Sequence, residues 1–169
     1  MANTQSMVTS FMGKLMTGTH NFGTGVVRAG TGADTYYGAL LLASGTFNAS
    51  SSDYTGTVGT TTMSGEVSGT GYTAGGVAIT NANPPTATNS SATAGVAFWT
   101  PSASITYTTV TLATAFDAVM IYNFTQGTGG AYPAVSIHTF GSQTITAGTF
   151  TLTMPTNNTT NALIRLATT

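Results

Sequence analysis

The sequence predicts an all-β fold: an antiparallel β-sandwich of jelly-roll-like form, with one short helix at the N-terminus. The first observation is composition, because the chain holds 38 threonines and β-branched residues favour extended backbone. The second is alternation, since several stretches switch between apolar and hydroxyl side chains with the period of two that strands show. The third is a supply of eight Phe, seven Tyr and one Trp, which favours a packed core over a disordered chain.

Residues 1–18 are predicted to form a helical arm, and residues 19–169 a single β-sandwich domain. The helix is identified by an apolar stripe with helical spacing, made of Met7, Val8, Phe11, Met12, Leu15 and Met16. Asn3, Thr4 or Ser6 is expected to cap its start, and Gly18 lies where it should end. Because so short a helix is marginal alone, the stripe is expected to pack either on the chain's own sheet or on another subunit.

Strands are expected along the rest of the chain. The predicted segments, bounded by glycine, proline and other turn residues, are 25–29, 35–44, 75–80, 95–99, 103–113, 116–124, 134–140, 142–154 and 162–168. Residues 46–62 are turn-rich, with one helical turn expected at 50–54. Residues 81–94 are predicted to be a loop, because the Pro84–Pro85 pair cannot join a regular ladder.

Two of these segments also predict where their strands lie in the sandwich. In 149–154, Phe150, Leu152 and Met154 alternate with threonines, which predicts a half-buried strand with one hydroxyl face. In 116–124 both faces are apolar, which predicts a central strand that is covered on both sides.

The chain carries very little charge. Charged residues make up 4% of it, and the net charge is −1; a typical domain has about 25% charged residues. Such a chain lacks the basic field that nucleic acids and anionic lipids require, so neither a nucleic acid nor a membrane is expected as a partner. A neutral surface also lacks the self-repulsion that keeps monomers apart, which favours a homo-oligomer, a dimer or trimer. The N-terminal segment has no signal-peptide pattern, so synthesis in the cytoplasm is expected.

Groups that could support catalysis or bind metal are few. The two histidines, His20 and His138, are far apart in the sequence, and no G-x-S-x-G motif is present. The acidic residues stand singly, whereas a glycosidase needs two neighbouring carboxylates and a metal site needs several ligands. No catalytic residue, metal or cofactor is predicted, and the protein is not expected to be an enzyme. Arg165 is expected either to pair with Glu66 or Asp117, or to point into solvent from an edge strand.

A glycine-rich element, GEVSGTGYTAGG, spans residues 65–76. It lacks the lysine of a phosphate-binding P-loop, and VAIT after it is typical of a strand rather than the helix of a dinucleotide-binding motif. The element is therefore predicted to be structural, with glycines that provide positive φ angles or close backbone approach. Its expected members are Glu66, Gly69, Gly71, Tyr72, Gly75 and Gly76.

This element belongs to a wider resemblance that covers most of the chain. The order of features, from SFMGKLMTG through E-V-x-G-x-G-Y-x-x-G-G to FWTPSASITYTTVTLA, FDAVMIYN and GTFTLTMPTNNTTNALIRL, resembles small virion structural proteins of tailed bacteriophages. The resemblance implies a decoration, or cement, protein on the capsid surface, with the major capsid protein and further copies of itself as partners. This chain has threonine where relatives carry Asp or Lys, which favours apolar and hydroxyl contacts over salt bridges.

The expected docking surface is part of the helix stripe, namely Met7, Phe11, Met12 and Leu15. Packing of the same side chains inside the chain is the competing interpretation. The alternative function is a tail, baseplate or fibre component that contacts host glycans, because Trp99 and Tyr132 offer rings that stack on sugars. A binding module of a bacterial surface is a further alternative.

Overall fold

The computed structural model describes residues 2–16, 18–20, 22, 33–80, 83, 85–88 and 95–167. The described chain is mostly β, with antiparallel sheets and one short helix, so the predicted all-β sandwich class is confirmed. The strand predicted at 25–29 lies outside the described residues.

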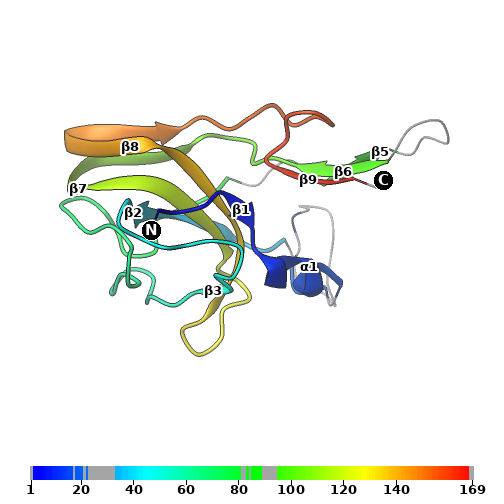
Figure 1. Ribbon diagram of the computed structural model, residues 1–169, viewed down its shortest axis with the longest axis horizontal. Coiled ribbons are helices and arrows are strands. Elements are labelled where there is room, and N and C mark those ends of the chain that lie inside the picture. Colours follow the sequence, from blue (N-terminus) through cyan, green and yellow to red (C-terminus); the bar gives the residue numbers. More distant parts are fainter. Residues whose placement is uncertain are drawn as a thin grey trace.

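A six-stranded antiparallel sheet forms the main body (Figure 1). Its strands are β1 (Ser6–Met7), β2 (Tyr36–Leu42), β3 (Asp53–Tyr54), β4 (Val77–Ala78), β7 (Ile105–Asn123) and β8 (Tyr132–Leu152). The order is β1-β8-β7-β2-β4, and β3 also pairs with β8. The sequence pattern does not reveal β1 or β3, because a two-residue strand shows no alternation. β3 takes the place of the helical turn expected at 50–54.

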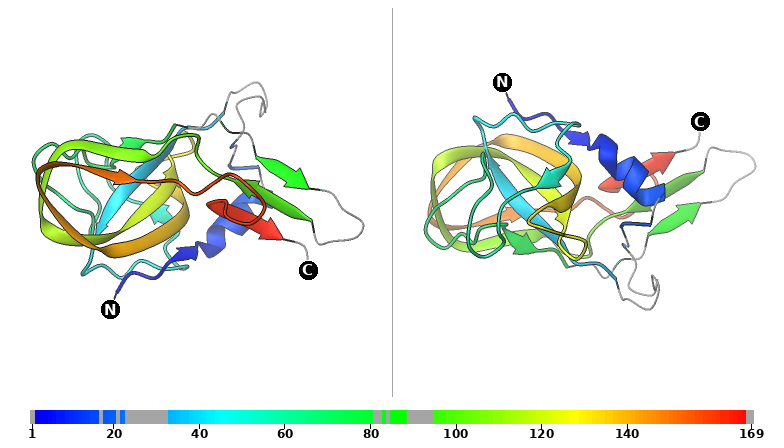
Figure 2. Two further views of the ribbon diagram at one scale, coloured as in Figure 1. Left: turned by 90° about the horizontal axis from the view of Figure 1, so that it is seen from above. Right: turned by 90° about the horizontal axis from the view of Figure 1, so that it is seen from below.

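Two long strands, β7 and β8, pair with each other along most of their length. The sequence predicts four shorter strands in this region, at 103–113, 116–124, 134–140 and 142–154. The strands are continuous because bulges absorb the breaks in alternation, and the register shifts between Leu112 and Phe116, among other places. Figure 2 shows both strands bending strongly, so that the sheet curls round on itself.

The two predictions about strand position are correct. Residues 118–123 are all buried, as expected for a central strand that is covered on both faces. On β8, Phe150 and Leu152 are half-buried while Thr149 and Thr151 are exposed. Phe124 is the exception, because it lies just beyond the end of β7 and is 36% exposed.

A second, three-stranded sheet has the order β5-β6-β9, with β5 at Thr86–Thr88, β6 at Val96–Trp99 and β9 at Ile164–Ala167. β6 and β9 agree with the predictions, but β5 falls within the predicted loop 81–94. The strand begins directly after Pro85, so this proline precedes the ladder rather than interrupting it. Figures 1 and 2 show this small sheet at one end of the molecule, beside the helix.

The single described helix, α1, spans Thr9–Met16. It starts later than predicted because Ser6 and Met7 belong to β1, so the expected caps do not act as caps. Its end is as predicted: Gly18 has a φ of +69°, its N–H donates to Leu15 O, and the Thr19 N–H donates to Lys14 O. These two bonds form the Schellman arrangement, which favours glycine.

Aromatic rings join α1, the small sheet and the main sheet into one core. The Phe22 ring stacks on Tyr36 of β2 at a centroid distance of 4.5 Å and lies 4.6 Å from Trp99 of β6. Phe11 of α1 contacts Phe22 edge-on at 5.9 Å. All four rings are buried, so the arm is held by the chain's own core.

Candidate functional site

Glu66 lies at the centre of the glycine-rich element, and its buried carboxylate accepts four hydrogen bonds from within the chain. Oε2 accepts from the Tyr54 hydroxyl and the Met63 N–H, both at 2.8 Å. Oε1 accepts from the Tyr72 hydroxyl at 2.8 Å and the Gly75 N–H at 2.7 Å. These donors replace the water that the carboxylate loses on burial, and they tie β3, Met63 and the segment from Tyr72 to Gly75 to one point. We call this set the Glu66 network.

The tyrosines around Glu66 stay protonated and uncharged. Burial, together with the negative charge of Glu66, raises the pKa values of Tyr54, Tyr72, Tyr107 and Tyr122 well above 10. The Tyr72 hydroxyl also accepts a 3.0 Å bond from the Leu40 N–H, so it links the element to β2. The remaining two hydroxyls donate to backbone carbonyls, Tyr107 to Gly38 and Tyr122 to Gly75.

The glycines of the element lie where the backbone approaches the main sheet closely. Gly76 has a φ of +76°, and a Cβ there would collide with the Gly38 carbonyl oxygen on β2. A Cβ at Gly69 or Gly71 would likewise meet a carbonyl oxygen of β7, that of Thr111 or Thr109. The structure thus brings the predicted members of the element together as a packed turn against β2 and β7, with no phosphate-binding loop geometry.

Arg165 meets neither of its predicted partners. The Glu66 network is filled by other donors, and Asp117 Oδ1 accepts a 2.6 Å hydrogen bond from Asn3 Nδ2. Arg165 is exposed on β9, an edge strand of the small sheet, so the solvent interpretation is correct. Asn3 was expected as a helix cap, yet it is buried and holds the N-terminal arm against Leu42 and Phe47.

The other two carboxylates lie apart from Glu66 and from each other. Asp53 forms a partly exposed ion pair with Lys14 at 3.0 Å. Asp34 is buried and accepts a 2.7 Å bond from Asn123 Nδ2, which also lies 3.2 Å from Nδ1 of His20. His20 thus takes part in a buried network that fastens the residues after α1 to the end of β7.

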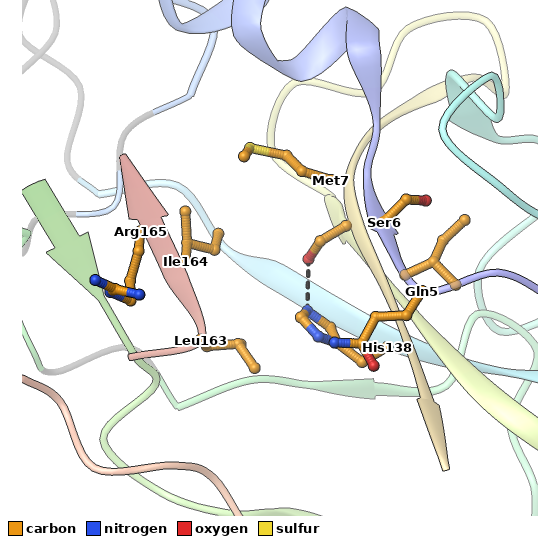
Figure 3. A pocket seen from close by; sticks show the side chains of 9 residues that line it. Gln5, Ser6, Met7, His138, Leu163, Ile164 and Arg165 are labelled. Carbon is orange, nitrogen blue, oxygen red and sulfur yellow. Dashed lines mark hydrogen bonds between the residues drawn. The ribbon is translucent and has the colours of Figure 1, made fainter. Parts of the chain in front are cut away.

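A cleft lies where β9 approaches one face of the main sheet (Figure 3). Its volume is about 240 Å³, and the side chains on its walls include Gln5, Met7, Ser136, His138, Leu163 and Ile164. Met7 and Ser136 are opposite each other in the β1–β8 ladder, so they point to the same face of the sheet. A neighbouring cavity of about 220 Å³ shares His138 and Leu163 as lining residues. We call the first cavity the His138 cleft.

Ser136 and His138 form a pair that the sequence analysis did not identify. Their Oγ and Nε2 atoms are 2.9 Å apart, and burial lowers the pKa of His138 to about 4. The i, i+2 spacing on a strand was the available signal, since it places both side chains on one face. A catalytic triad also needs a carboxylate beside the histidine and an accessible serine. The described lining of the cleft holds no acidic residue, and Ser136 is 2% exposed, so the pair lacks both of these features.

The predicted docking stripe is divided by the structure. Phe11 is fully buried, and Met7 lies in β1 rather than on the helix. Met12 is 51% exposed, and Leu15 is half-buried. A shallow apolar groove of about 100 Å³ adjoins them, lined by Phe11, Leu15, Phe22, Pro85, Ala97, Phe98, Trp99, Ile164 and Leu166. We call it the α1 groove.

The rings proposed for glycan contact also differ in accessibility. Trp99 is 2% exposed, so it is a core residue. Tyr132 is half-buried and stacks on the exposed ring of Phe124 at a centroid distance of 5.5 Å and an angle of 10°. Tyr37 adds a third ring, 4.9 Å from Phe124. These three residues form an aromatic cluster at the base of the β7–β8 turn.

In the described part of the chain, no three His, Asp or Glu side chains come together as a metal site requires. Among the same residues, no helix is long and apolar enough to cross a membrane. No family model matches the sequence, and comparison with curated proteins and with solved structures gave no match.

Proposed function

We propose that this protein is a non-enzymatic structural protein of a phage virion, a decoration protein that binds the outer surface of the head. It stabilises the shell by contact with the major capsid protein and with neighbouring copies of itself. The virion assignment rests on the resemblance carried by the E-V-x-G-x-G-Y-x-x-G-G element and the segments that follow it.

The observation that carries the non-enzymatic part of the proposal is how the chain uses its charges. Each of its four carboxylates accepts hydrogen bonds or an ion pair from the same chain, at four separate places. The four carboxylates therefore stabilise the fold. The surface that remains is mainly hydroxyl and apolar, which suits a protein that works through contact area.

We assign docking to the end of the molecule formed by α1 and the small sheet. Met12 and Leu166 are two of the large apolar side chains that the described chain exposes, at 51% and 38%. Leu15 and Leu166 line the α1 groove, and Met12 lies on the same helix. The charged residues on these elements are Lys14, which pairs with Asp53, and Arg165, which is next to Leu166, so the rest of the contact is made through apolar and hydroxyl groups.

The test uses heads from virions that lack this protein, to which purified protein is added back. Wild-type protein should co-sediment with the heads and raise the temperature at which they release their genome. The double variant Met12→Asp, Leu166→Asp should lose at least tenfold in affinity, because a charge buried against an apolar surface is costly. Thr151→Asp, on the hydroxyl face of β8, is the matched control. Equal binding by both variants would overturn the assignment of the surface, and wild-type protein found only with tails would overturn the function.

A second candidate function is contact with host glycans, and the aromatic cluster favours it. The parallel Phe124 and Tyr132 rings offer an exposed apolar platform on which a sugar can stack. Replacement of Phe124 by Ala should then reduce adsorption of whole virions to host cells while leaving binding to heads unchanged. Unchanged adsorption would exclude this role for the cluster.

A further inference from the structure

We propose that the His138 cleft binds a neutral, ring-sized apolar group that carries a hydroxyl, as a phenol does. Binding in the cleft does not depend on the proposed function, because it concerns the chemistry of the cleft alone. Only the last arm of the test, which identifies the natural occupant, uses heads and rests on that function. Figure 3 shows the cleft between the sheet face at β1 and β8 and the start of β9. Gln5 and Arg165, which also line it, are exposed, so the cleft is open to solvent.

The size of the cleft fits a single ring. Its volume is about 240 Å³, and the adjoining cavity holds about 220 Å³. An apolar cavity of roughly 150 Å³ is enough to bind benzene in a protein interior. Met7, Leu163 and Ile164 supply apolar walls, and Figure 3 shows their side chains directed into the space between β1 and β9. A ring with one short substituent is therefore accommodated.

The lining favours a neutral group over an ion. Burial lowers the pKa of His138 to about 4, so its ring is uncharged at neutral pH. Gln5 and Ser136 are also uncharged, and Figure 3 shows the Arg165 side chain pointing away from the space between Met7 and Ile164. A cationic ligand would lose its water there without gaining an opposite charge, because Arg165 is the one charged residue of the described lining.

The histidine selects a hydroxyl. Its Nε2 is hydrogen-bonded to the Ser136 hydroxyl at 2.9 Å, which leaves Nδ1 as the ring nitrogen for a ligand. In a neutral imidazole, Nδ1 donates in one tautomer and accepts in the other, and a hydroxyl can satisfy either. A ring with a hydroxyl has two sources: a small phenol, or a tyrosine side chain of a neighbouring protein chain.

The test titrates p-cresol, and separately toluene, into the full-length isotope-labelled protein. NMR signals of the Met7 methyl, the Ile164 methyls and the His138 ring should shift with both compounds, with a dissociation constant on the order of 1 mM for p-cresol. p-Cresol should bind several-fold more tightly than toluene, because only it bonds to the histidine. His138→Leu should remove that difference while leaving toluene binding intact. Ser136→Ala, which keeps the ring, should preserve it.

Two further variants locate the site. Leu163→Phe should weaken both compounds at least fivefold by filling the cleft, whereas Phe124→Leu, in the exposed aromatic cluster, should weaken neither. Three results would each overturn the proposal: shifts centred on Phe124, no shifts at Met7 and Ile164, or a preference for p-cresol over toluene that is as large in His138→Leu as in wild type. With heads present, release of the protein by p-cresol identifies a neighbouring tyrosine as the natural occupant. Occupation of the cleft without release excludes a tyrosine that holds the protein on the head and leaves a small phenol as the occupant.

Discussion

Tyr72 donates a 2.8 Å hydrogen bond from its hydroxyl to Oε1 of Glu66, which lies six residues earlier in the glycine-rich element. The same hydroxyl accepts the N–H of Leu40 at 3.0 Å, so one side chain connects the buried carboxylate to a strand of the main sheet. The E-V-x-G-x-G-Y-x-x-G-G pattern, on which the resemblance to phage virion proteins rests, is therefore explained by contacts within the chain. Four donors meet one carboxylate, and close-packed glycines let the backbone reach it.

The first prediction concerns the charge of Glu66. Glu66→Gln should lower the free energy of unfolding by about 2–4 kcal/mol, because the amide NH₂ would face donors that have lost their acceptor. Urea unfolding followed by tryptophan fluorescence measures this. Asp53→Asn is the matched control, since its ion pair with Lys14 is partly exposed and should cost no more than about 1 kcal/mol. Equal losses in the two variants would contradict the central role of the Glu66 network.

The second prediction compares two glycines with the same backbone conformation. Gly76 and Gly59 both have φ near +80°, but only at Gly76 would a Cβ strike the backbone, while nothing lies within 4 Å of a Cβ at Gly59. Gly59→Ala should cost about 1–2 kcal/mol from the backbone alone. Gly76→Ala adds the collision with β2 and should cost more than about 3 kcal/mol or prevent folding. Thermal or urea unfolding that ranks the two variants equally would show that the close packing against Gly38 is not real.

The third prediction concerns alkaline titration. Burial and the Glu66 charge raise the pKa values of Tyr54, Tyr72, Tyr107 and Tyr122 in the folded state. Their contribution to stability is fully present below the unfolded value of about 10 and is lost as the pH rises above it towards the folded values. Ultraviolet absorbance of tyrosinate should show these four ionising only together with loss of the native circular dichroism. Full ionisation of all seven tyrosines in a still folded protein would contradict this environment.

The fourth prediction concerns acid. Because burial lowers the folded pKa of His138 from 6.5 to about 4, the unfolded state binds more protons between these values. The contribution of this group is fully present above pH 6.5 and is lost as the pH falls from there towards 4. The stability of wild type relative to His138→Leu should therefore decrease by about 1–3 kcal/mol over that window and stay constant above it. A difference that does not change with pH would mean that the pKa of His138 is the same in the folded and unfolded states.

Much of the fold can be predicted from the alternation of apolar and polar residues and from the positions of glycines. The alternation of Phe150 and Leu152 with threonines fixes the exposed face of β8, and the two-sided apolar run at 118–123 fixes the central strand. Gly18 ends the helix because the Schellman arrangement needs a residue at positive φ, and glycine adopts positive φ without strain. The continuity of β7 and β8 was not predictable, because β-bulges break the apolar and polar alternation by which a continuous strand is identified.

The candidate sites were less accessible to sequence reasoning, because their partners lie far apart in the chain. The sequence predicts that Arg165 either pairs with Glu66 or Asp117, because an unpaired buried charge is costly, or points into solvent from an edge strand. Tyrosine hydroxyls, backbone N–H groups and the Asn3 amide serve instead, and hydrogen-bond donors of that kind leave no charge pattern to detect. The His138 cleft depends on how β9 crosses the main sheet, which no local spacing encodes.

A cryo-EM map of the parent virion shows directly whether this protein decorates the head. We expect many copies distributed over the outside of the head, with the α1 and small-sheet end, including Met12 and Leu166, in contact with the major capsid protein. Density for the protein confined to the tail, baseplate or fibres, or absent from the particle, would contradict this expectation.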